Sequence, residues 1–144
     1  MAKSKQKEVI LPTEQDIEKP KRKRSSSYSR NKGNAYERKI VSELNELGFN
    51  VGTSRNNSKQ LDNNKIDIYD IDGTLPCDIQ LKCTQNIPSY FNIREESTAN
   101  PERFVIIWSK QEKREVNIVS VGEVAILPKS LFYKLIKNYK ESEE

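Results

Sequence analysis

Five consecutive apolar residues, Phe104-Val105-Ile106-Ile107-Trp108, constrain the fold of this chain more than any other feature. An unbroken apolar run is typical of a strand that is buried on both faces of a sheet. Only 34% of the 144 residues are hydrophobic, so few segments can supply a core. We therefore expect a central strand over residues 103–109, within one domain that carries some additional tail.

Two segments have the periodicity of helices. In residues 35–47 the apolar residues recur at helical spacing, and Gly48 follows where a glycine typically ends a helix. Ordered structure is expected to begin near Gly33. Residues 128–139 predict a final helix with five apolar side chains along one face, namely Leu131, Phe132, Leu135, Ile136 and Tyr139.

Four further short segments predict strands because they are apolar or alternate between apolar and polar residues, over 49–54, 65–71, 78–84 and 116–121. The polar residues 56–64 predict a loop, and residues 87–101 predict a loop with a helical turn. This order of elements predicts an α/β fold, a mixed β-sheet flanked by helices.

A turn at Asp72-Gly73 predicts that the strands on either side of it form a hairpin. If Gly73-Thr74 is a two-residue turn, Asp67 faces Gln80, with the two Cβ atoms roughly 5 Å apart. Period-two alternation places Asp78, Gln80 and Lys82 on one face and the intervening residues on the other. One face of the hairpin then gathers two acids, an amide oxygen and a lysine, although a longer turn would change this register.

The net charge of +4 is concentrated near the N-terminus. Residues 1–31 hold nine Lys/Arg and four acids, a net of +5, and the other sixteen basic and seventeen acidic residues sum to −1. We expect this segment to be a disordered basic arm, followed by a folded domain over residues 32–144. Its basic run, Lys21-Arg22-Lys23-Arg24, is suited to phosphate binding, although a nuclear-localisation look-alike or a merely solvated tail has the same composition.

The composition excludes several kinds of catalytic site. The chain contains no histidine, which excludes Ser-His-Asp and Cys-His catalysis and histidine-ligated zinc. Cys77 and Cys83 give no disulfide framework, no apolar run is long enough to span a membrane, and we expect no secretory signal, because no apolar segment follows the first lysines. We expect a cytoplasmic protein whose chemistry depends on carboxylates, lysine, amides, hydroxyls or a hard metal ion.

Glu37 is the acidic residue most unusual in its position. It precedes Ile40, Val41 and Leu44 at helical spacing and so lies on the apolar stripe, where a carboxylate is costly unless it is paired or bound to a metal. Alternatively, Glu37 compensates the charge of the first helical turn. With the acid and amide oxygens of the hairpin it would form a site suited to Mg²⁺, with Mn²⁺ as a substitute. The competing interpretation of the hairpin residues is an ordinary solvated face.

Four separated motifs resemble archaeal-type Holliday junction resolvases and small phage-encoded endonucleases of the PD-(D/E)xK superfamily. Residues 32–38 and 47–54 resemble the opening helix and strand of that family. Ile66-Asp67-Ile68 and Ile79-Gln80-Leu81-Lys82 resemble the two halves of its nuclease signature, at a similar separation. The resemblance covers roughly residues 30–110.

The resemblance implies a restriction-endonuclease-like core, dependence on Mg²⁺, a homodimer and branched DNA as substrate. By position, Glu37 is similar to the acid of the first helix, Asp67 to the metal-bridging aspartate and Lys82 to the motif lysine. Gln80 stands where the family has Asp or Glu, so the site loses a negative charge, and Asp78, two residues away on the same face, is the candidate to offset this loss. The proline of the signature is also missing.

The same comparison suggests residues that contact DNA. Ser54 and Arg55 follow the first strand, where the family has residues near the scissile phosphate, although a polar loop end would look the same. Lys32 and Arg38 would extend a phosphate-binding surface, which positions DNA without reading its sequence.

Three functions therefore compete with a nuclease specific for branched DNA. The first keeps the chemistry and changes the substrate to duplex DNA, as in a repair or restriction-like nuclease. The second is a non-catalytic DNA-binding protein with a degenerate nuclease fold, which the glutamine at position 80 favours. The third is an interaction protein that acts through its basic arm.

Overall fold

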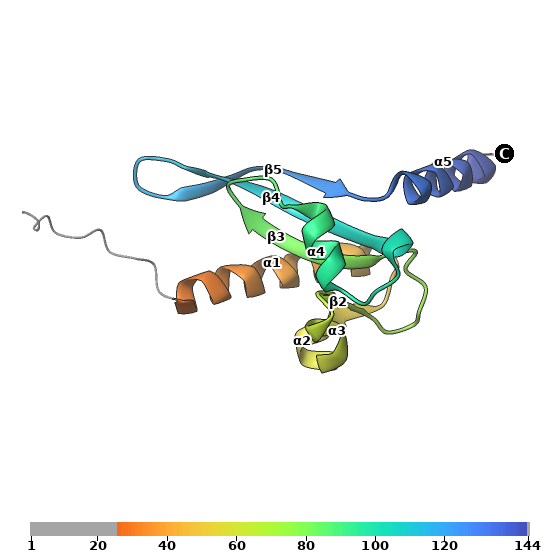
Figure 1. Ribbon diagram of the computed structural model, residues 1–144, viewed down its shortest axis with the longest axis horizontal. Coiled ribbons are helices and arrows are strands. Elements are labelled where there is room, and N and C mark those ends of the chain that lie inside the picture. Colours follow the sequence, from red (N-terminus) through yellow and green to blue (C-terminus); the bar gives the residue numbers. More distant parts are fainter. Residues whose placement is uncertain (1–25, 144) are drawn as a thin grey trace, which may run out of the picture. The chain divides into compact units, whose positions relative to one another are not determined.

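The computed structural model describes residues 26–143, which have mixed α/β structure (Figure 1). The elements in chain order are α1 (Ser26–Glu46), β1 (Val51–Thr53), α2 (Ser54–Asn57), α3 (Lys59–Asn63), β2 (Ile68–Asp70), β3 (Asp78–Thr84), α4 (Tyr90–Glu96), the 3₁₀ helix η1 (Pro101–Arg103), β4 (Phe104–Lys113), β5 (Ile118–Ile126) and α5 (Lys129–Glu143). The predicted basic run at residues 21–24 and most of the predicted arm lie outside the described residues.

The strands form two small sheets. β1 and β2 pair antiparallel, and β3, β4 and β5 form a second sheet in which β3–β4 is parallel and β4–β5 antiparallel. The central strand predicted from the apolar run is confirmed, because Phe104 and Ile106 are both 0% exposed. β4 is longer than predicted and continues through a register shift between Lys110 and Gln111.

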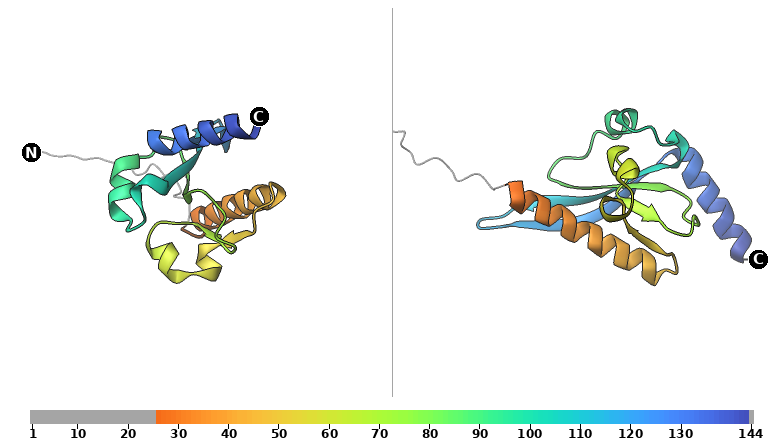
Figure 2. Two further views of the ribbon diagram at one scale, coloured as in Figure 1. Left: turned by 90° about the vertical axis from the view of Figure 1, so that its right-hand side faces the viewer. Right: turned by 90° about the horizontal axis from the view of Figure 1, so that it is seen from below.

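Apolar side chains pack on both faces of the β3–β4 pair, which explains the unbroken apolar run of β4. On one face Ile79 and Leu81 join Ile40 of α1 in a core cluster, and on the other Phe104 and Ile106 pack with residues of α4. Figure 2 shows α1 and α4 on opposite sides of the sheet. The predicted alternation of faces along residues 78–84 is confirmed.

The first helix starts earlier than predicted. α1 begins at Ser26 instead of near Gly33, so residues 26–31, which we assigned to the disordered arm, are helical. The apolar stripe that marks this helix in the sequence begins only at Tyr36, and the polar turns before it carry no periodic signal. Gly33 weakens a helix by about 1 kcal/mol but does not end it. Gly48 follows the helix with a φ of +106°, as a terminating glycine should.

The predicted loop over residues 56–64 is wrong, because the short helices α2 and α3 occupy this segment. Thr53 Oγ1 accepts a hydrogen bond from Asn56 N, and Ser58 Oγ accepts one from Leu61 N. These two side chains satisfy amides at the helix starts, which a polar composition alone does not reveal. Residues 87–101 contain α4, in agreement with the helical turn predicted there, and η1 begins at the last of them.

The predicted two-residue hairpin is also wrong. Among the described residues β2 pairs only with β1, and β3 pairs with β4. A longer loop connects β2 to β3, and the Asp70 carboxylate holds it by accepting hydrogen bonds from Gly73 N at 3.0 Å and Leu75 N at 2.8 Å. Leu75 is buried in the core cluster on the α1 side, so burial of an apolar loop residue favours this path over a tight turn.

No helix in the described part of the chain is long and apolar enough to cross a membrane.

Candidate functional site

Asp67 lies directly before β2, beside the edge of β3. Its backbone amide donates to Ile79 O at 2.8 Å, and its side-chain Oδ2 accepts a hydrogen bond from Leu81 N, also at 2.8 Å. The two bonds thus join Asp67 to the residues immediately before and after Gln80. The neighbourhood of Asp67 and Gln80 that the sequence predicted is therefore present, although the connection between their strands differs from the predicted turn.

The Asp67 carboxyl group has a strongly perturbed pKa. Burial raises its pKa from the ordinary value of 3.8 to about 6, whereas the hydrogen bond from Leu81 acts in the opposite direction. The negative charge of Glu37 raises the pKa further, and the positive charge of Lys82 lowers it. The predicted acid of the helix and the predicted lysine of the strand thus both act electrostatically on Asp67.

Gln80 contributes an oxygen atom with unused hydrogen-bonding capacity. Its side chain is 7% exposed, and Oε1 has no hydrogen-bond partner among the described residues. An unsatisfied polar atom in such a position costs about 1–3 kcal/mol, so an arrangement of this kind requires a compensating gain. A buried amide oxygen on the strand that the Asp67 carboxylate contacts fits the oxygen ligands that Mg²⁺ prefers.

This set of oxygen atoms carries little negative charge for a metal site. Within residues 26–143 no three His, Cys, Asp or Glu side chains gather in a way that could hold a metal ion. The candidate site instead combines Asp67 and Glu37 with the neutral amide of Gln80. It fits a hard cation in the chemistry of its oxygen donors, and weak binding is expected.

Glu37 is engaged by an arginine. Nη2 of Arg55 lies 2.8 Å from Oε1 of Glu37, and the Glu37 side chain is only 16% exposed. This pair explains how a carboxylate is tolerated on the apolar side of α1. Sequence reasoning identified both residues but did not pair them, since α1 and α2 meet only in the folded chain.

Ser54 supports Asp67 and does not face solvent. The Ser54 side chain is 0% exposed, its hydroxyl donates to Ile66 O, and its backbone amide donates to Asp67 O at 2.9 Å. The prediction that Ser54 contacts DNA is therefore corrected. A buried hydroxyl with this partner fixes the segment before β2 and thereby positions Asp67.

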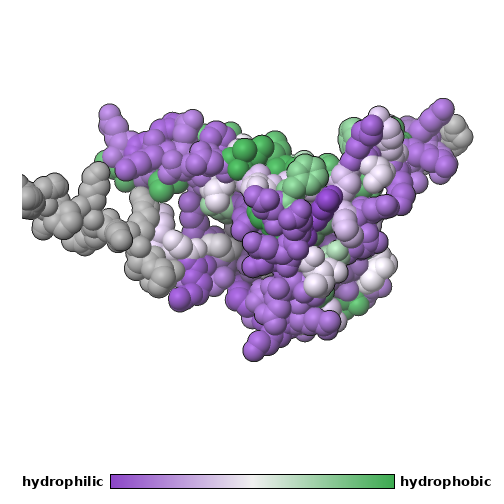
Figure 3. All heavy atoms as spheres, viewed as in Figure 1, coloured by the Kyte–Doolittle hydropathy of each residue, from purple (hydrophilic) through white to green (hydrophobic). Residues whose placement is uncertain are grey.

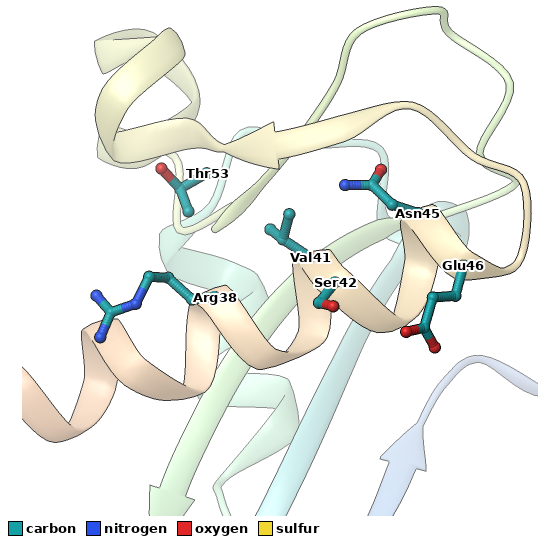
Figure 4. Close-up of a pocket in the computed structure, with 6 residues that line it drawn as sticks. All are labelled: Arg38, Val41, Ser42, Asn45, Glu46 and Thr53. Carbon is teal, nitrogen blue, oxygen red and sulfur yellow. The ribbon is translucent and has the colours of Figure 1, made fainter.

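A groove runs along the outer side of α1 beside β1 (Figure 4). Its volume is about 440 Å³, and Arg38, Val41, Ser42, Asn45, Glu46 and Thr53 line it. The Arg38 side chain is exposed there, whereas Lys32 is half-buried. Figure 3 shows hydrophilic side chains over the neighbouring α2 and α3 on the face viewed. Arg38 thus lines the groove, and the exposed Arg55 belongs to the neighbouring α2.

Asp78 does not compensate for the amide at position 80, as we had considered. Its Oδ1 and Oδ2 accept hydrogen bonds from Arg103 Nη2 at 3.2 Å and Nε at 3.4 Å, and the same guanidinium donates to Leu75 O. Arg103 had no assigned role in the sequence, where nothing in its spacing links it to Asp78. The pair connects the start of β3 with the start of β4.

We expect Asp78→Asn to lower the free energy of unfolding by about 1 kcal/mol, because it weakens a partly exposed ion pair. DNA binding and any cleavage should match the unsubstituted protein. Urea unfolding and a DNA-cleavage assay on the same sample measure both properties. Loss of cleavage with an unchanged unfolding curve would return Asp78 to the candidate site.

Together these residues offer a half-buried carboxylate at Asp67, a buried amide oxygen at Gln80 without a partner among the described residues, and the opposite charges of Glu37 and Lys82, which both act on Asp67. Such a set can bind a hard cation and orient a phosphate ester beside an ammonium group. Comparisons of the chain with protein-family models, with curated proteins and with solved structures found no match.

Proposed function

We propose that this protein is a Mg²⁺-dependent endonuclease that hydrolyses phosphodiester bonds in branched DNA such as Holliday junctions. One observation carries the proposal. Asp67, whose pKa is raised by desolvation, bonds through its backbone and its carboxylate to the residues on either side of Gln80. The Gln80 Oε1 atom is buried without a partner among the described residues, and Lys82 follows two residues later on β3. Perturbed carboxyl groups next to unsatisfied polar atoms are typical of functional sites.

The fold is consistent with this proposal at a coarse level. The structure is mixed α/β, with helices on both sides of the β3–β4 pair. The two halves of the nuclease-like signature lie next to each other, since Asp67 hydrogen-bonds to both Ile79 and Leu81. A restriction-endonuclease-like core is the finer assignment that we propose for it.

Each residue of the site has a chemical role in the proposed reaction. Asp67 and Gln80 would hold the metal ion through their oxygens, and Glu37 would join them when DNA phosphate draws Arg55 away. When bound, Mg²⁺ supplies charge neutralisation at the phosphate and lowers the pKa of water. The Lys82 ammonium orients the scissile phosphate and neutralises charge that develops on it.

The DNA itself would be held through its backbone. Arg55 and the exposed Arg38 supply the phosphate contacts closest to the site, and Lys32 extends them along α1. Such contacts do not read sequence, which suits a nuclease that recognises the shape of DNA. The proposal includes a preference for branched DNA and a homodimeric state, which the family resemblance implies. It also includes a cytoplasmic location, which the composition favours.

We expect the purified protein to nick a synthetic four-way junction in Mg²⁺, and Lys82→Ala to slow this reaction about 100-fold or more. The matched control is Lys113→Ala, which removes an exposed lysine at the end of β4 and should cut at the unsubstituted rate. Denaturing gels of end-labelled junction strands measure the rates, with EDTA as the blank. Equal cleavage by the two variants would contradict the assigned role of Lys82.

The substrate preference is tested in the same assay with flap and linear duplex of matched sequence and salt. Faster cutting of the linear duplex than of the junction would show that ordinary duplex DNA is the preferred substrate.

A non-catalytic DNA-binding protein is the second candidate, and two observations favour it. Residue 80 is an amide, and Glu37 is paired with Arg55. Tight junction binding without cutting in Mg²⁺ or Mn²⁺ would support this candidate and reject the nuclease.

A further inference from the structure

Trp108, the single tryptophan of the chain, lies at the border of the core on the sheet face that α4 covers. It packs against the cluster of Tyr90, Phe104 and Ile106, yet it is only half-buried. Its indole N–H donates hydrogen bonds to Thr84 O at 3.2 Å and to Thr84 Oγ1 at 2.9 Å. These bonds hold the ring in one orientation, so a ligand that stacks on it has little side-chain entropy to overcome.

Two lysines flank Trp108 on this face. Lys82 of β3 stands opposite Trp108 in the parallel pairing with β4, so the two side chains share a face on strands about 4.8 Å apart. Lys110 places its Nζ 5.8 Å from the centroid of the indole ring and donates to Gln85 O at 2.9 Å. At Gly122, opposite Lys110 on β5, an added Cβ would meet nothing within 4 Å, so the space beside the lysine is open.

The acids of the sheet do not neutralise these lysines. In the three described strands, the strand pairing places Asp78 and Glu112 on this face. Asp78 is paired with an arginine, as described above, and Glu112 lies 2.7 Å from Nη2 of Arg114. Glu123 stands opposite Ser109 and therefore belongs to the other face.

Helix α4 adds no net charge to the face once its ion pair is counted. Its charged residues are Arg94, Glu95 and Glu96, and Nζ of Lys65 lies 3.9 Å from Oε1 of Glu96. The surplus positive charge is therefore that of the two lysines beside Trp108. Such a surplus attracts phosphate groups.

We infer that Trp108 is a stacking platform for one unpaired nucleotide base, whose flanking phosphates contact Lys82 and Lys110. This inference rests on the proposed function and names the part of the DNA substrate that the face binds. A phosphate at Lys82 brings its own base to the neighbouring strand, because a single sugar joins the two. Stacking on an aromatic ring accepts any base, since every base has a π-face.

The base must be unpaired, because a base inside a duplex is already stacked on its neighbours. Nucleotides at a branch or in a single-stranded flap are unstacked at lower cost. The base replaces the Lys110 ammonium over the indole, and the ammonium then contacts the next phosphate. The platform explains how a site that does not read sequence distinguishes branched DNA from linear duplex.

The first test uses the fluorescence of Trp108, which falls when a base stacks on the ring. Because the full chain has one tryptophan, its selectively excited emission reports on this position alone. We expect a duplex with a short unpaired flap to reduce the emission at least about twofold at saturation. The fully paired duplex of the same sequence should leave it almost unchanged. The titrations are made in EDTA, so the result does not depend on cleavage.

The second test compares the affinities of variants for labelled flap DNA by fluorescence anisotropy. Trp108→Ala should bind about tenfold more weakly than the parent, and Trp108→Phe should recover most of the affinity because it keeps an aromatic face. Tyr133→Ala is the matched control, since it removes an aromatic side chain that is 58% exposed but belongs to α5. This control should bind as the parent does.

The outcomes separate the platform from the nuclease. Flap binding with unchanged tryptophan emission would overturn the platform and leave the nuclease proposal intact. Quenching by flap DNA without any cutting in Mg²⁺ would support the platform and reject the nuclease. Equal quenching by flap and duplex, or equal affinities of Trp108→Ala and Tyr133→Ala, would contradict the platform. A chain that binds no DNA would overturn both proposals.

Discussion

Asp67→Asn is expected to abolish DNA cleavage and at the same time to make the metal-free protein more stable. Cleavage should fall by about 1000-fold or more, because the amide removes the negative charge that would attract the cation. Stability should rise because that charge is costly without a metal. The Asn side-chain oxygen can still accept the hydrogen bond that Leu81 N donates to Asp67 Oδ2.

The size of the stability effect follows from the raised pKa of Asp67. The pKa of Asp67 is about 6 in the folded state and 3.8 in the unfolded chain. This difference corresponds to a change of roughly 3 kcal/mol in the free energy of unfolding. Between these two pH values the folded protein binds more protons than the unfolded chain, so its stability falls as pH rises. The folded protein therefore loses stability progressively between about pH 4 and about pH 6. Above this range the charged Asp67 side chain lowers the free energy of unfolding by its full amount.

Urea unfolding in EDTA, at intervals from pH 4 to pH 7.5, measures this effect. The difference in unfolding free energy between Asp67→Asn and the parent should be near zero at the acidic end and should grow up to about 3 kcal/mol at neutral pH. Glu115→Gln is the control, because Glu115 is an exposed acid in the loop between β4 and β5 and is not among the charges that act on Asp67. A variant that is less stable than the parent at pH 7.5 would show that Asp67 is a structural carboxylate.

Burial patterns in the sequence predicted the core better than they predicted strand pairing. The apolar run from Phe104 to Trp108 identified β4 because a strand covered on both faces has few polar positions. Alternation in residues 65–71 identified a strand but not its neighbour. The choice of β1 as partner depends on the Asp70 carboxylate, which holds the following loop, and on burial of Leu75 within that loop.

The candidate site shows the same division. The sequence predicted that Asp67 and Gln80 would be neighbours through a two-residue turn at Gly73-Thr74, and they are neighbours although a longer loop connects their strands. It could not predict that Ser54 is buried against the backbone before β2 or that Arg103 binds Asp78, since both contacts join segments that are distant along the chain. Side chains with several potential partners are assigned only when the tertiary contacts are known.

Gln80→Glu and Gln80→Met are expected to change metal dependence in opposite directions. Glutamate adds a second carboxylate beside Asp67, so the metal-free protein should lose several kcal/mol of stability, and Mg²⁺ should bind about tenfold more tightly than to the parent. Methionine fills a similar volume and removes the unsatisfied Oε1, so the metal-free protein should gain about 1 kcal/mol. Its stability should no longer respond to Mg²⁺.

Thermal unfolding in EDTA and over a Mg²⁺ titration separates these effects, since a ligand that binds only the folded state stabilises it by about 2.7 kcal/mol at 100 times its Kd. The titration should shift the melting temperature most for Gln80→Glu, less for the parent and not at all for Gln80→Met. Gln111→Met is the matched control, because Gln111 is 5% exposed but donates through Nε2 to Ser109 Oγ at 3.0 Å. That variant should lose stability and keep the parental response to Mg²⁺. Because Gln80 differs from Gln111 in its unpartnered oxygen, equal Mg²⁺ responses of the two methionine variants would remove Gln80 from the metal site.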